Sequence, residues 1–190
     1  MAKSNSDNDD IFGIFTGKWN IARTIHKHSD KSVVGTVTGT ACFYPQPDST
    51  ILLHEKLEVT WENSTTAQAT KSYLFKKAPG TIIQYRFETP IDPNKNTILT
   101  TEQTNEKIEM HQLNFIGYMS SSVANATYLC GSDEYKLRFE VRSGTHFTMD
   151  YEVLGEGKSC YIHTEFNKLN EHDSDQCDLL GDSSSFGDLS

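Results

Sequence analysis

Six polar side chains share a strand face with apolar residues, which makes them the strongest candidates for a binding site. They are Arg23, Glu55, Lys71, Tyr73, His111 and Tyr135. A polar group on a buried face must be paired, hydrated or functional, because its desolvation is otherwise unfavourable. One hypothesis is a cavity in which Arg23 and Lys71 hold a carboxylate while the histidine and tyrosines supply hydrogen bonds. The alternative is an internal network, for example Arg23 with Glu55, that closes the fold and binds nothing.

Other chemistry has weaker support in the sequence. His111 could ligate a haem iron, but no second His, Cys or carboxylate stands at metal-ligand spacing. His26 and His28 share a face and are typical of surface histidines. A thiol nucleophile needs a Cys–His pair, whereas Cys130 and Cys160 lie in predicted strands and are expected to pack as small apolar residues. We therefore predict no metal site, no cofactor and no motif-borne catalytic residue.

The candidate residues are positioned by segments in which apolar and polar residues alternate, the pattern of a strand with one buried face. The clearest segment is 51–61, and the same period extends over 18–25, 36–43, 67–77, 81–88, 107–116, 123–130, 133–142, 146–154 and 158–167. These ten segments have short links, and no amphipathic helix is longer than a turn. They predict an all-β, antiparallel up-and-down meander. Closure into a barrel is favoured over a sandwich, because it removes exposed strand edges.

The sequence predicts one domain with two polar ends. Residues 1–10 are expected to form a disordered polar head, followed by the barrel domain over 11–169. An apolar cluster at 11–15, preceded by two aspartates, predicts one helical turn that closes part of the fold. Residues 89–106 form a long polar connection. The tail at 170–190 is expected to be disordered, and it either docks a protein partner or only solubilises the chain.

The charge lies mainly in the tail. The net charge is -9, and residues 170–190 contain six acidic residues without Lys or Arg, which leaves a body of nearly neutral charge. Such a body offers no basic field for nucleic acid or for an anionic membrane. No segment is long and apolar enough to span a bilayer, and the polar N-terminus is unlike a secretory signal. The four cysteines are widely spaced, so we expect free thiols and a cytoplasmic location.

Residues Gly17-Lys18-Trp19 resemble the Gly-x-Trp signature of lipocalins and other calycins, in which the tryptophan closes one barrel end and an arginine packs on it. The resemblance implies structural roles for Gly17 and Trp19. A wider set of segments is similar to one family of small lipocalin-like domains that is catalogued as a domain of unknown function. These segments are 17–19, 23–25, 39–43, 53–55, 69–73, 110–113, 153–155 and, most specifically, Cys130-Gly131-Ser132-Asp133-Glu134-Tyr135. The resemblance covers roughly residues 12–168 and implies no known activity.

Three functions remain open from the sequence. The leading hypothesis is an intracellular barrel that binds a small, mostly apolar ligand with a polar or anionic end. The second is a non-catalytic interaction module, whose barrel is filled by its own aromatic residues and whose tail docks a partner. The third is an enzyme of the isomerase or lyase type that acts on a bound hydrophobic substrate. A continuous cavity above about 300 Å³ would favour the first hypothesis over the second.

Overall fold

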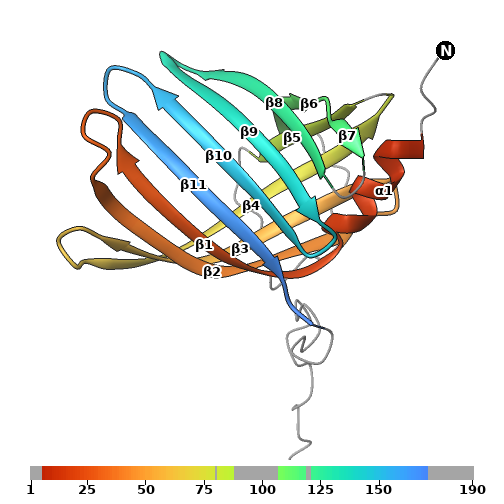
Figure 1. Cartoon of the computed structure of the whole chain (residues 1–190), viewed down its shortest axis with the longest axis horizontal. Coiled ribbons are helices and arrows are strands. Elements are labelled where there is room, and N and C mark those ends of the chain that lie inside the picture. Colours follow the sequence, from red (N-terminus) through yellow and green to blue (C-terminus); the bar gives the residue numbers. More distant parts are fainter. Residues whose placement is uncertain (1–5, 80, 88–106, 119–120, 171–190) are drawn as a thin grey trace, which may run out of the picture.

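Eleven antiparallel strands form one sheet that curls into a nearly closed barrel, with a helix at one end (Figure 1). The computed structural model describes residues 6–79, 81–87, 107–118 and 121–170. The helix is α1 (Ser6–Phe15). The strands are β1 (Gly17–Lys27), β2 (Val33–Pro45), β3 (Thr50–Trp61), β4 (Thr66–Ala78), β5 (Thr81–Phe87), β6 (Lys107–Leu113), β7 (Ile116–Tyr118), β8 (Ser121–Cys130), β9 (Asp133–Ser143), β10 (His146–Leu154) and β11 (Ser159–Lys168).

The strand order is that of an up-and-down barrel. It runs β6-β5-β4-β3-β2-β1-β11-β10-β9-β8-β7, so the first strand pairs with the last and β6 comes round to lie beside β8. The predicted all-β barrel is confirmed. One predicted strand, 107–116, is wrong in its extent: it divides into β6, which pairs with β5, and the three-residue β7, which pairs with β8. The chain thus changes its pairing partner from β5 to β8 between β6 and β7, where the two edges of the sheet approach each other.

The helix is longer than the single predicted turn. It begins at Ser6, so residues 6–10 are helical rather than part of a disordered head, while residues 1–5 and the acidic tail at 171–190 lie outside the described residues. Gly17 joins the helix to β1 with a φ of 115°, a left-handed conformation that glycine adopts without strain. This requirement accounts for the glycine of the Gly-x-Trp signature.

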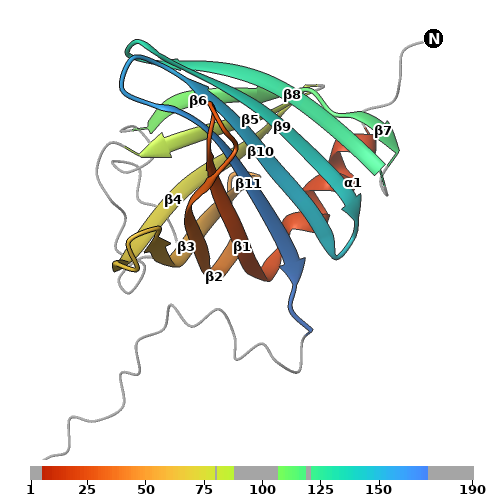
Figure 2. The ribbon, with the colours of Figure 1, turned by 60° about the vertical axis from the view of Figure 1, so that its left-hand side comes forward.

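Helix α1 closes one end of the barrel by burying Phe15. The side chain is 0% exposed and lies 5.3–6.2 Å, between ring centroids, from four other phenylalanines: Phe43, Phe75, Phe139 and Phe147. Trp19 is also fully buried, and its Nε1 donates a hydrogen bond to the Phe15 carbonyl oxygen at 2.8 Å. Both views show α1 across one end of the barrel, away from the β1–β2 and β10–β11 turns (Figure 2). The prediction that the apolar cluster closes the fold is confirmed.

A lysine, not an arginine, packs on the Trp19 ring. The Nζ of Lys168 lies 5.3 Å from the Trp19 ring centroid and donates a hydrogen bond to the Ile14 carbonyl oxygen at 3.1 Å. The arginine contact that the family resemblance implied for Arg23 is therefore absent from the described residues. Arg23 lies further along β1, opposite Thr164 of β11, and its side chain lines the barrel interior.

Substitution of Phe15 by alanine should cost about 3–5 kcal/mol of unfolding free energy, because it leaves a cavity among aromatic rings. Urea denaturation followed by circular dichroism measures this loss. Phe12→Ala is the matched control, since Phe12 lies on the same helix and is only partly buried. If both substitutions cost the same, the closure of this end does not depend on Phe15.

Candidate functional site

The half of the barrel away from α1 contains a cavity of about 290 Å³. Its walls are mainly apolar and come from β1–β6 and β9–β11, with Ile25, Val37, Leu57, Val59 and Ile162 among the apolar residues. Trp61, at the end of β3, is 44% exposed and also lines the cavity. The interior is thus filled at one end and hollow at the other, so the packed interior expected of a pure interaction module is not observed.

Five of the six predicted site residues line this cavity, namely Arg23, Glu55, Lys71, Tyr73 and Tyr135. They meet because the strand register places Lys71 opposite Glu55, and Tyr73 opposite Leu53. Four further residues line the cavity that were not predicted from the sequence, namely Gln84, Met110, Tyr151 and Thr164. The alternation of Phe147, Met149, Tyr151 and Val153 with polar residues indicates that Tyr151 faces the interior.

Arg23 belongs to an internal polar network. Its Nη2 lies 3.2 Å from Glu55 Oε1, and its Nε donates a hydrogen bond to Thr164 Oγ1 at 2.9 Å. The side chains of Arg23 and Glu55 are only 14% and 3% exposed. This ion pair is the one that the alternative hypothesis named, and it compensates the Arg23 charge within the lumen.

Two other basic side chains, the exposed Lys71 and the partly buried Arg86, line the hollows without an ion pair among the described residues. Lys71 forms no ion pair or hydrogen bond there, although it lies opposite Glu55 in the register. Arg86 of β5 is paired with Tyr73, and its buried Nε has no partner. Both residues line an adjoining hollow of about 230 Å³, which shares Lys71, Tyr73 and Met110 with the main cavity. This part of the lumen wall is therefore cationic.

The electrostatics of the lumen keep its side chains in defined protonation states. Burial, and secondarily the Arg23 charge, lower the pKa of Lys71, while Glu55 opposes that change. Burial raises the pKa of Tyr73, with the Glu55 charge acting in the same direction. Burial likewise raises the pKa of Tyr151. Both tyrosines are therefore neutral phenols at physiological pH and can donate hydrogen bonds.

His111 does not line the cavity, contrary to its predicted place in the site. His111 pairs with the cavity-lining Gln84 and so faces the barrel interior, but Met110, the extra residue of a β-bulge in β6, is the residue of that strand that lines the cavity. His111 is 1% exposed, with its ring 5.7 Å from that of Tyr151, and neither ring nitrogen has a partner among the described residues. Burial lowers its pKa to about 4. This position gives no support to a haem ligand.

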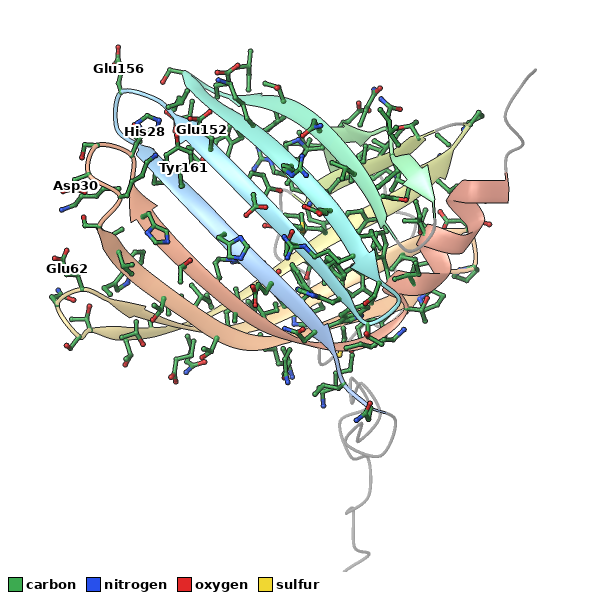
Figure 3. The ribbon with its side chains drawn as sticks, in the orientation of Figure 1. His28, Asp30, Glu62, Glu152, Glu156 and Tyr161 are labelled. Atoms are coloured by element: carbon green, nitrogen blue, oxygen red, sulfur yellow. The ribbon has the colours of Figure 1, made fainter. Side chains whose placement is uncertain are left out.

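The outer face of the barrel carries a second polar cluster. His28 Nε2 lies 3.1 Å from Glu152 Oε1, and the Tyr161 hydroxyl donates a hydrogen bond to the same oxygen at 2.8 Å (Figure 3). These residues adjoin a hollow of about 560 Å³ over β8–β11, where Asp150 also contacts His163. Its charges are largely paired and solvent-exposed. No group of three metal-ligating side chains occurs in the described part of the chain.

The cysteines do not form a nucleophilic site. Cys130 and Cys160 are free thiols, but Cys130 is exposed at the end of β8, so its expected burial is wrong. Burial raises the pKa of the Cys160 thiol, which disfavours the reactive thiolate. Cys42 is disulfide-bonded, and the expectation of free thiols fails for that residue. The described helix is also not long and apolar enough to cross a membrane.

These features define a lipocalin-like barrel, with one end closed by apolar residues and a cavity lined by both apolar and polar residues. The model of the Family of unknown function (DUF6314) matches residues 15–168, so the chain belongs to that family. Among curated proteins, none gives a significant sequence match.

This chain is similar to solved structures at low sequence identity. The S-type phycobiliprotein lyase CPES from Guillardia theta has a TM-score of 0.57 and 8% identity, over 87% of this chain and 94% of that chain. A redesigned β-barrel, b11L5F_LGL, has a TM-score of 0.36 and 12% identity, over 85% of this chain and 96% of the other. At such identities, the likeness to the lyase shows the fold alone.

His111 should make the protein sensitive to acid. Its folded pKa is about 4, whereas a histidine in the unfolded chain titrates near 6.5. The unfolded state therefore binds a proton that the folded state rejects, and stability falls as the pH drops from about 6.5 to about 4, by roughly 3 kcal/mol. In His111→Phe and His111→Gln this part of the pH dependence should disappear. Denaturation at several pH values measures it, and profiles as steep as wild type would contradict the assignment.

Proposed function

We propose that the lumen binds a small, mostly apolar molecule whose anionic end lies against Lys71 and Arg86. The observation that carries this proposal is the presence of two basic side chains that form no ion pair in the described residues, Lys71 on the wall of the apolar cavity and Arg86 on the wall of the adjoining hollow. Arg23 is less suited to this role than Lys71, because Glu55 already balances its charge. A carboxylate, sulfonate or phosphate would complete the charge balance at Lys71 and Arg86.

The dimensions of the lumen support a ligand of modest size. The main cavity of about 290 Å³ lies just below the range of about 300–1,000 Å³ for small-molecule sites, and the adjoining hollow of about 230 Å³ extends it toward Arg86. Apolar walls stabilise an apolar body by removing it from water. The neutral Tyr73 and Tyr151 hydroxyls add hydrogen-bond donors to the wall of the main cavity.

A catalytic function has less support than binding. The lyase whose fold is similar is named for chemistry on phycobiliproteins, but at 8% identity that activity does not carry over. The cavity is lined by Lys71 and by the Glu55 carboxylate, which is paired with Arg23. Its described lining residues include no nucleophile–base pair. The cytoplasmic location and a partner for the acidic tail stay predictions from the sequence.

Binding can be tested with 2-anilinonaphthalene-6-sulfonate, a fluorescent probe with an apolar body and one anionic end. We expect saturable binding to the wild-type protein, and a loss of about 10-fold or more in affinity for Lys71→Met and Arg86→Met, since each substitution removes a charge-assisted contact. Fluorescence titration measures both affinities.

Lys56→Met is the matched control for this titration. Lys56 lies on β3 beside Glu55, but it is exposed on the outside of the barrel and lines neither hollow. Its substitution removes the same charge and should leave the affinity unchanged. Absence of saturable binding, or equal affinities for the lumen variants and wild type, would refute the proposed site.

A further inference from the structure

Two hydrogen-bond acceptors are buried in the lumen without a donor. Glu55 Oε2 and Gln84 Oε1 have no hydrogen-bond partner in the described part of the structure. The two residues are 2% and 1% exposed, and both line the main cavity. They come from different strands, β3 and β5, so their convergence on one cavity is a product of the barrel and not of local sequence.

No donor of the described wall forms a hydrogen bond with either atom. Arg23, the closest cation to Glu55, bonds the other carboxylate oxygen through Nη2 and directs Nε to Thr164. Lys71 makes no hydrogen bond to Glu55, although the two residues face each other across β3 and β4. Gln84 contributes a hydrogen bond to Tyr151, which leaves its own carbonyl oxygen unused. Within the described wall these two acceptors therefore have no donor of the protein's own.

Buried hydrogen-bond acceptors without a donor are unusual in a native protein. A buried polar atom left without a partner is strongly unfavourable, and native structures contain few of them. Unpartnered polar atoms gathered on a cavity are satisfied by ordered water or by a bound molecule, and a ligand gains affinity when it reproduces the bonds of the water it displaces. Here the atoms to be satisfied are acceptors, so the occupant has to donate.

We propose that the molecule bound in the lumen carries N–H or O–H donors on its apolar body, and that Glu55 Oε2 and Gln84 Oε1 accept them. This inference rests on the proposed function and specifies its ligand class. The ligand has two polar features: an anionic end at Lys71 and Arg86, and a neutral donor such as a secondary amine, amide or hydroxyl. The donor is neutral because Arg23 already balances the Glu55 charge.

This chemistry separates the ligand from a simple fatty acid, which has an anionic end but no donor along its chain. A site built to hydrogen-bond a donor discriminates strongly against an analogue that lacks it, because the buried acceptor is then left unpaired. The apolar walls alone distinguish ligands of similar size only weakly. Glu55 and Gln84 are thus the specificity-determining residues of the lumen.

The test compares two probes that differ in one group: 2-anilinonaphthalene-6-sulfonate, which has an N–H donor, and its N-methyl analogue, which has none. The wild-type protein should bind the N–H probe at least about 10-fold more tightly, as a lost hydrogen bond to a buried acceptor predicts. Gln84→Met removes one acceptor at similar size, and it should reduce this preference by at least about 3-fold. Fluorescence titration gives all four affinities.

Thr148→Val is the matched control. Thr148 is 0% exposed and also has an unpartnered oxygen, but it lies on β10 outside the set of cavity-lining residues. Its substitution should change neither affinity. If the N-methyl group merely clashes with the wall, Gln84→Met will keep the full preference, and the donor inference is then wrong.

The outcomes separate this inference from the proposed function. If neither probe binds saturably, both are refuted. If both probes bind with equal affinity and Lys71→Met weakens both, the anionic site stands and only the donor assignment to Glu55 and Gln84 is overturned.

Discussion

The burial of Phe15 divides the barrel into two unlike halves, and the rest of the molecule depends on that division. The helix places this side chain among four other phenylalanines, and the Trp19 hydrogen bond to its carbonyl oxygen fixes where α1 ends. Aromatic packing of this kind supplies a large part of the stability of a small barrel. Because that end is dry and filled, the other half can remain hollow and polar without loss of the fold.

The Arg23–Glu55 ion pair governs the electrostatics of the hollow half. It lies almost out of contact with water, with Thr164 holding the guanidinium in place. Buried pairs of this kind contribute little net stability, but they fix geometry. Because the Arg23 and Glu55 charges cancel each other, Lys71 and Arg86 determine the sign of the electrostatic potential in the cavity.

Much of the fold and most of the site follow from the sequence, because a period of two identifies the inward residues of each strand. Arg23, Glu55, Lys71, Tyr73 and Tyr135 reach the lumen for that reason. His111 also faces the interior, opposite Gln84, but it is buried outside the cavity lining, and Met110 lines the cavity through a β-bulge in β6 that the alternation of residues does not predict. The start of α1 at Ser6 and the division of 107–116 depend on packing and strand pairing, which alternation does not encode.

The polar lumen residues, which look alike as a pattern in the sequence, have three different physical states. Arg23 and Glu55 Oε1 are satisfied within the protein, Lys71 and Arg86 are charged without a partner, and Glu55 Oε2 and Gln84 Oε1 are acceptors without donors. Only the first state stabilises the free protein. The buried atoms without a partner weaken it, whereas Lys71 is exposed to solvent, and a fold tends to retain such groups where binding needs them. Because Arg86 Nε, Glu55 Oε2 and Gln84 Oε1 line adjoining hollows, one occupant explains these three atoms better than separate defects of packing do.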